Sequence, residues 1–163
     1  MVRCGRRMRK IRNRRIFYVL VLAVLLLGGR GTDIGQLRPV EVVRVYEKAG
    51  LLFLETDTGD AGWGLTVDEA VKKLKETTMG EIYLDTADYL LLEEGIDDCL
   101  GEVRTYLKKK TKMAYSEGKI DLEVAASYLR VHSPSETVGN GNKPMEMLSF
   151  EGGKIILKKF KEI

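Results

Sequence analysis

The chain has 163 residues, which is room for one domain of ordinary size plus a short appendage. Its composition is globular, with 44% hydrophobic and 31% charged residues, and its formal net charge is +3. The charge is uneven, because residues 1–15 hold eight basic side chains and no acidic one, and Arg30 is a ninth. The other 18 basic residues stand against 24 acidic ones in residues 31–163. This acidic part argues against nucleic acid as a partner, since phosphate binding needs a cationic surface.

Residues 16–29, IFYVLVLAVLLLGG, form an uncharged apolar segment directly after the basic residues 1–15. As a helix the segment rises about 21 Å, less than the roughly 30 Å of a hydrocarbon core, and its length also suits the apolar region of a signal peptide. No A-x-A cleavage site follows it, and no cysteine stands just after Leu27 to accept a lipid. We therefore expect an uncleaved, single-pass membrane anchor. The positive-inside rule makes residues 1–15 a cytoplasmic tail and places the C-terminal domain on the extracytoplasmic side.

Residues 30–38 predict a linker, and residues 39–163 predict a single globular domain. The domain opens with β-branched residues over 40–47, which predict a strand. Residues 51–56 predict a second strand, so the two form a hairpin around the short turn between them.

Residues 58–64 are rich in glycine and predict a loop. Thr66 and Glu69 have the spacing of a capping box and open a helix that ends at Gly80. A short strand is predicted over residues 81–85. The following residues, 87–92, fit either an extension of that strand or a helical turn.

Apolar residues at helical spacing predict a second helix from Ile96 to about Lys108. A strand is predicted over residues 111–115, and Asp121 caps a third helix. Residues 132–145 have the composition of a loop.

The chain closes with two segments, residues 146–150 and 154–160, on either side of a Glu-Gly-Gly turn, which predicts a hairpin. The predicted order is β-β-α-β-α-β-α-β-β. It indicates a mixed α/β fold, a small mixed β-sheet layered with about three helices and with parallel neighbours in its centre, preceded by the N-terminal anchor helix.

A single histidine and a pair of aspartates are the candidates for catalysis or metal binding. His132 is the single histidine of the chain, and Asp85 and Asp88 follow a predicted strand. Two carboxylates at a strand end could hold a hard cation or do acid–base work, but aspartates also cap turns without any chemistry. The chain has no phosphate-loop spacing and no G-x-S-x-G motif. We therefore expect no catalytic, cofactor-binding or metal-binding residue, and no cofactor.

The two cysteines, Cys4 and Cys99, lie on opposite sides of the expected membrane and so form no disulfide within one chain. Cys99 falls in a helical pattern and is expected to be a small buried hydrophobic residue.

A candidate contact surface is expected from residues 60–65 and 84–92. Trp63 could anchor a partner, or it could fold back and cover the first hairpin. The residues assigned to partner contact are Asp60, Trp63, Asp85, Asp88 and Tyr89.

Part of this sequence resembles a known family. The segments WGLTVDEA at residues 63–70 and GEIYLDTADYLLL at residues 80–92 resemble the N-terminal domain of the Ger(x)C family, the C subunits of spore germinant receptors. MAYSEG at residues 113–118 and LEVAA at residues 122–126 are similar to a later segment of that domain. Family members begin with a signal that ends in leucine, glycine and a lipidated cysteine, whereas this chain has glycine in place of the cysteine, at Gly29.

The resemblance implies a shortened relative that lacks the larger C-terminal part of the family. It also implies a non-enzymatic role in spore germination, with germinant-receptor subunits as partners. The leading hypothesis is therefore a membrane-anchored accessory protein that acts by protein–protein contact outside the cytoplasm. One alternative is a small metal-assisted hydrolase that uses Asp85, Asp88 and His132, which requires these side chains to converge. A second alternative is a structural module of an envelope or spore layer.

Overall fold

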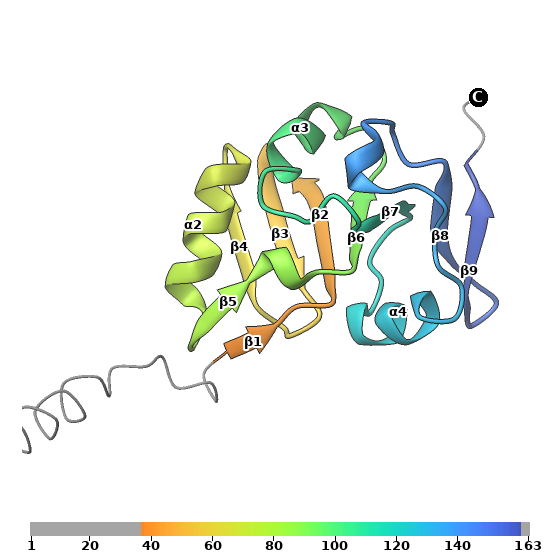
Figure 1. Ribbon diagram of the computed structural model, residues 1–163, viewed down its shortest axis with the longest axis horizontal. Helices are drawn as coiled ribbons and strands as arrows, with labels where there is room; N and C mark the ends of the chain where they lie inside the picture. Colours follow the sequence, from red (N-terminus) through yellow and green to blue (C-terminus); the bar gives the residue numbers. More distant parts are fainter. Residues whose placement is uncertain (1–36, 161–163) are drawn as a thin grey trace, which may run out of the picture. The chain divides into compact units, whose positions relative to one another are not determined.

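A mixed sheet of seven strands lies at the centre of the computed structural model, which describes residues 37–160 (Figure 1). The order across the sheet is β4-β3-β2-β6-β7-β8-β9. The strands are β2 (Val42–Lys48), β3 (Leu51–Thr56), β4 (Ala61–Gly64), β6 (Tyr89–Glu93), β7 (Lys112–Ser116), β8 (Glu146–Glu151) and β9 (Lys154–Lys159).

The centre of the sheet is parallel and its two ends are antiparallel. β2, β6, β7 and β8 pair in parallel, while β3 and β4 at one end and β9 at the other pair in antiparallel fashion. The β7–β8 pairing is short, with Tyr115 opposite Met147 and Ser116 opposite Leu148. The mixed α/β sheet and both predicted hairpins, β2–β3 and β8–β9, are confirmed.

A second, two-stranded sheet joins β1 (Leu37–Pro39) to β5 (Glu81–Tyr83) in parallel. The predicted linker, residues 30–38, therefore extends two residues too far, because residues 37 and 38 belong to a strand. The strand predicted over 81–85 is shorter than expected and gives way to the 3-10 turn η2 (Leu84–Thr86). Thr86 Oγ1 accepts from the Val40 amide at 2.9 Å, which ties this turn to the start of β2.

The first helix, α2 (Val67–Thr77), begins as predicted. Thr66 Oγ1 accepts from the Glu69 amide at 3.3 Å, and the Glu69 carboxylate accepts from the Leu65 amide at 2.8 Å. These bonds satisfy backbone donors that the first turn of a helix leaves unpaired.

The prediction of the second helix is mostly wrong. In place of a helix over residues 96–108 the chain forms the 3-10 turn η3 (Asp97–Cys99) and one helical turn, α3 (Leu100–Val103). Thr105 Oγ1 donates to the Glu102 carbonyl at 2.7 Å, and the Tyr106 amide donates to the Val103 carbonyl three residues earlier. This tightening into i→i+3 bonds and the competing threonine side chain explain why the helix stops.

The third predicted helix is confirmed as α4 (Leu122–Leu129). Asp121 Oδ1 accepts from the amides of Glu123 at 3.0 Å and Val124 at 3.2 Å, as an N-cap should. The predicted loop of residues 132–145 contains one 3-10 turn, η4 (Val138–Asn140).

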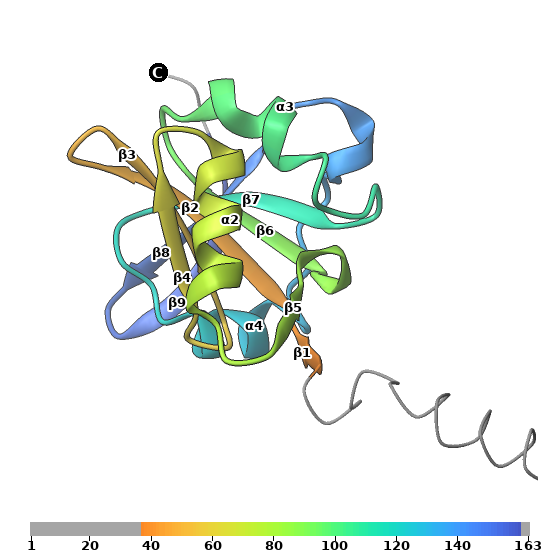
Figure 2. The same cartoon turned by 90° about the vertical axis from the view of Figure 1, so that its left-hand side faces the viewer.

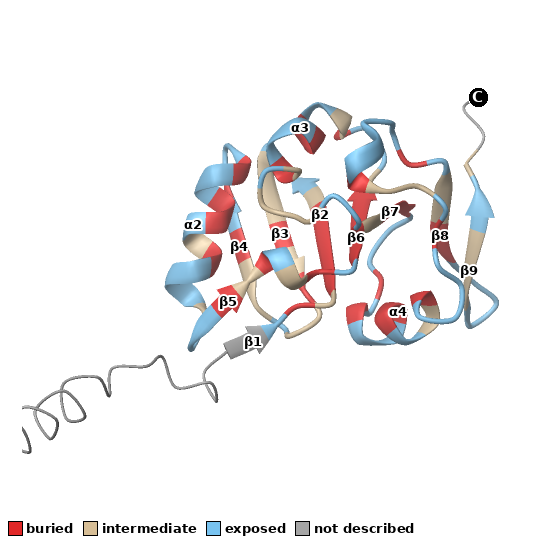
Figure 3. Cartoon of the chain, viewed as in Figure 1, coloured by how far each residue is buried: buried red, intermediate tan, exposed pale blue. Residues whose placement is uncertain are grey.

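Helices cover both faces of the sheet. Alternate strand residues, such as Val43 and Val45, pack with α2 and α3, whereas Val42 and Leu91 pack with α4. Figure 2 looks onto α2 with the sheet behind it, and Figure 3 shows the buried residues concentrated on the central strands. Cys99 is buried in the cluster beneath α3 as expected, and this burial raises the pKa of its thiol to about 11.

The glycine-rich segment after residue 58 was expected to be a loop, but residues 61–64 form β4. The reason is the close approach of α2. A Cβ atom on Gly62 would lie 2.1 Å from the Ala70 carbonyl oxygen, and one on Gly64 would lie 2.3 Å from the Glu69 Cβ. The glycines are therefore required for helix-on-strand packing, and they do not mark a turn.

Within residues 37–160, no helix has the length and apolar character needed to cross a membrane. The tail expected over residues 1–15 and the anchor helix expected over residues 16–29 lie outside the described residues.

Candidate functional site

Three aromatic rings form a ladder across β2, β3 and β4. Tyr46 pairs with Phe53, and Phe53 pairs with Trp63 in the strand register. The Tyr46 and Phe53 rings stack with centroids 5.2 Å apart, and the Phe53 and Trp63 rings stack at 6.4 Å. Since Gly62 and Gly64 face α2, Trp63 between them points to the opposite face of the sheet. The ring at the end of this aromatic ladder, Trp63, is 42% exposed.

Both ends of the aromatic ladder carry a cation. The Arg44 guanidinium lies 4.6 Å from the Tyr46 ring centroid, and Lys73 Nζ lies 5.6 Å from the Trp63 centroid. Lys73 belongs to α2, which packs on the glycines at either side of Trp63. Lys73 Nζ also lies 3.6 Å from a carboxylate oxygen of Glu76. The two end rings, Tyr46 and Trp63, therefore each make a cation–π contact.

Arg44 connects the aromatic ladder to the chain that follows β7. The residue is 4% exposed, its Nη2 donates to the Gly118 carbonyl at 2.6 Å, and its Nη1 lies 3.8 Å from Glu55. Its Nε is buried without a hydrogen-bond partner. The Tyr46 hydroxyl donates to Glu55 at 2.6 Å, and burial, followed by this bond, raises the pKa of Tyr46 to about 12.

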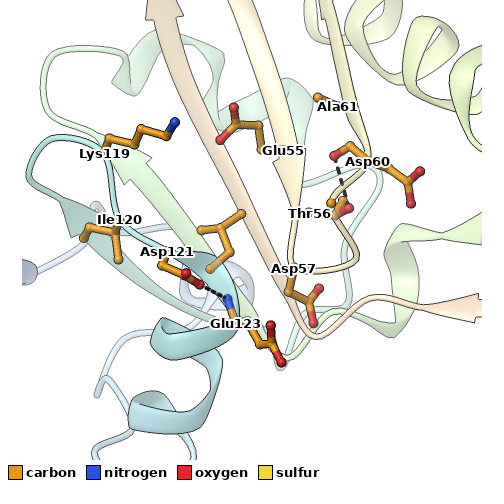
Figure 4. Close-up of a pocket in the computed structure, with 11 residues that line it drawn as sticks. Glu55, Thr56, Asp57, Asp60, Ala61, Lys119, Ile120, Asp121 and Glu123 are labelled. Carbon is orange, nitrogen blue, oxygen red and sulfur yellow. Dashed lines mark hydrogen bonds between the residues drawn. The ribbon is translucent and has the colours of Figure 1, made fainter.

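An acidic pocket of about 330 Å³ lies beside Glu55, where the end of β3 and the start of β4 face the segment that leads into α4 (Figure 4). Five carboxylates and one ammonium group line it: Glu55, Asp57, Asp60, Asp121, Glu123 and Lys119.

Several of the pocket's carboxylates are committed to local structure. Asp57 Oδ1 accepts from the amides of Glu41 and Val42, Asp121 caps α4, and Asp60 accepts from Thr58 Oγ1 at 2.8 Å. They shape the loops around the pocket. Among residues 37–160 there is no group of three or more His, Cys, Asp or Glu side chains that could hold a metal ion.

The structure does not bring the five predicted contact residues to one place. Asp60 and Trp63 lie at β4. Asp85 lies in η2, Asp88 lies between η2 and β6, and Tyr89 begins β6, which β3 and β2 separate from β4 in the sheet. Asp85 and Asp88 are exposed. Tyr89 is only 9% exposed, packs in the cluster beneath α4 and has its pKa raised by that burial, so it offers little surface to a partner.

The three residues of the hydrolase hypothesis do not form a metal-binding group in the described part of the chain. His132 follows α4, and its ring stacks on Tyr128 with centroids 4.4 Å apart. The convergence that this hypothesis requires is therefore not found.

The candidate residues predicted from the sequence did not include Arg44, Tyr46, Phe53 or Lys73. A signal for two of them was available, because a two-residue turn at Ala49-Gly50 sets the hairpin register that places Tyr46 opposite Phe53. Both turn residues have positive φ, +55° and +75°, as such a tight hairpin turn requires.

No protein-family model, no curated protein and no solved structure matches this chain.

Proposed function

We propose that the chain is a non-enzymatic accessory protein, anchored in a membrane by residues 16–29, that works by protein–protein contact outside the cytoplasm. Spore germination is the setting suggested by the resemblance of residues 63–130 to the Ger(x)C family, and germinant-receptor subunits are the proposed partners.

The observation that carries the proposed contact is the aromatic ladder. Its last ring, Trp63, is large, 42% exposed, and held in place by stacking on Phe53 and by its position on a strand. Tryptophan is enriched among the residues that contribute most to binding at protein interfaces, because a rigid ring buries a large area at a small cost in conformational entropy. Asp60 precedes the same strand and supplies a polar residue beside it.

The test is crosslinking in intact membranes, followed by capture of the full chain and identification of what is bound. Trp63→Ala should strongly reduce partner recovery. The matched control is Phe150→Ala, because Phe150 is also an exposed aromatic residue, 62% exposed, but lies on β8 in the other half of the sheet.

Three outcomes would contradict the proposal. One is equal partner recovery with Trp63→Ala and with Phe150→Ala. A second is capture of only further copies of the chain, which would favour a structural module of an envelope or spore layer. The third is an intact mass that shows loss of residues 16–29 together with release of the chain from the membrane.

A further inference from the structure

The outer edge of β4 exposes backbone hydrogen-bonding groups. The Thr56 amide donates to the Asp60 carbonyl at 3.0 Å, so these two residues form a hydrogen-bonded pair of the β3–β4 ladder. Such pairs alternate with pairs whose backbone groups point away from the partner strand, which places Ala61 and Trp63 at outward positions. Consistent with this, the Ala61 carbonyl accepts from Thr77 Oγ1 of α2 at 3.1 Å. The N–H and C=O of Trp63 therefore face the edge of β4 that no other described strand covers.

The other edge of the sheet, β9, is protected by charge. Its residues include the exposed lysines Lys154, Lys158 and Lys159, and lysines on an edge strand oppose pairing with another chain. β4 has the sequence Ala-Gly-Trp-Gly and carries neither a charged residue nor a proline. Its edge therefore lacks the protection that β9 has.

Carboxylates flank β4 at both ends. Asp60 directly precedes the strand, and Glu55 is the cross-strand partner of Ala61. At the other end, the Glu69 carboxylate binds the amide of Leu65, the residue after β4. On α2, Glu76 lies beside Lys73, whose ammonium group lies over the Trp63 ring. Glu76 can retain the ammonium group of Lys73 if another cation takes its place on the ring.

We propose that the edge of β4 binds an extended, lysine- or arginine-rich segment of a partner protein, which adds to the sheet as an eighth strand. The backbone of that segment pairs with Trp63, and its side chains alternate between the two faces, so that basic side chains on the ladder side contact the Trp63 ring and Glu55. A second copy of this chain is disfavoured, because two β4 edges would bring their flanking carboxylates together. The inference rests on the proposed function and specifies the chemistry of the partner.

Trp63 provides the readout, since it is the only tryptophan in the chain. The full chain in uncharged detergent micelles is titrated with an octapeptide of alternating lysine and valine, while Trp63 emission is recorded. A saturable change with a shift to shorter wavelength is expected, because the added strand excludes water from the ring. The affinity should fall as salt is added, since the flanking carboxylates are exposed enough to be screened.

Two further peptides separate charge from backbone pairing. A glutamate–valine octapeptide should bind at least about tenfold more weakly, because its carboxylates meet those that flank β4. The lysine–valine peptide with a fully N-methylated backbone keeps its charge but cannot donate to the ladder, and it should also lose binding. Equal affinity for either peptide and for the original would overturn the proposal.

The double variant Asp60→Asn with Glu69→Gln should weaken binding of the lysine–valine peptide about tenfold. The matched control is Glu146→Gln with Glu151→Gln, which removes the same charge from β8. An unchanged affinity in the first variant, or an equal loss in both, would overturn the proposal. A Trp63 shift that depends on protein concentration without peptide would assign the edge to a second copy instead. If the peptides fail while partner capture still depends on Trp63, only this inference falls and the proposed function stands.

Discussion

Both ends of the sheet extend its parallel centre with antiparallel strands, but the two edge strands, β4 and β9, differ in their protection. β9 is a six-residue strand with three lysines, and its backbone edge is protected by charge. β4 has four uncharged residues and is held mainly by α2, which packs directly on its two glycines. Close helix packing thus holds this edge strand in place, and the outward backbone groups of Trp63 stay uncovered by any described strand.

The largest effect is expected from breaking the packing that holds β4. Gly62→Ala places a Cβ atom 2.1 Å from the Ala70 carbonyl oxygen, and backbone on both sides prevents easy relief. We expect a loss of about 3 kcal/mol in the free energy of unfolding, the upper end of overpacking costs, measured by urea unfolding of the full chain. Gly101→Ala is the control, because no atom of the described residues outside its chain neighbours and its own helix backbone lies within 4 Å of its new Cβ. A similar stability for both variants would contradict this account of β4.

The second largest effect is expected from Arg44, the buried cation on β2 in the half of the sheet that contains β4. Arg44→Met removes the bond to the Gly118 carbonyl and the contact with the Tyr46 ring, and it should cost about 2 kcal/mol. Arg130→Met removes an ion pair with Glu41 at the surface and should cost less, because solvent screens that pair. Urea unfolding of both variants checks the ranking. A larger loss for Arg130→Met would mean that Arg44 is not what fixes the segment after β7.

A third comparison uses one exposed aromatic residue from each end of the sheet. Trp63→Ala loses the stacking on Phe53 and should lower the free energy of unfolding by about 1 kcal/mol. Phe150→Ala should cost less, because Phe150 is 62% exposed, against 42% for Trp63. Far-ultraviolet circular dichroism can follow unfolding in both variants. Equal losses would remove the energetic distinction between the two ends.

The smallest effect is a dependence on alkaline pH. The pKa of Tyr46 is raised from 10.0 to about 12 in the folded chain, so between these values the folded state holds a proton that the unfolded state has lost. Stability from Tyr46 is therefore complete below pH 10 and falls as the pH rises toward 12. The advantage of the natural chain over Tyr46→Phe in urea unfolding should shrink across this window. A difference between the two chains that stays constant with pH would show that burial and the bond to Glu55 do not raise the pKa of Tyr46 in solution.

The parts of the fold that were predicted correctly depend on local signals. The two hairpins follow from strand-forming segments on either side of short turns, and the start of each confirmed helix follows from a capping side chain, Thr66 or Asp121. These signals act within a few residues, so the sequence displays them directly.

The parts that were missed depend on contacts between distant residues. The glycines of β4 predicted a loop because glycine is common in turns. They are required instead for close packing against α2, a contact that exists only in the folded chain. The helix predicted from residue 96 was too long because Thr105 competes for the Glu102 carbonyl. In the candidate site, Trp63 and Asp60 were identified from the sequence, but Lys73 and the buried Arg44 were not. Their positions depend on how α2 and the segment after β7 pack on the sheet.

The short pairing between β7 and β8 has a consequence for how the molecule yields under stress. Only two residue pairs join these strands, whereas six join β8 to β9. The β8–β9 hairpin is therefore expected to open as a unit, at a free energy below that of global unfolding. Amide hydrogens of that hairpin should exchange through this partial opening, whereas those of β2 and β6 should exchange only through global unfolding. A pulling force applied beyond β9 would peel away this hairpin first and leave the end that carries β4 intact.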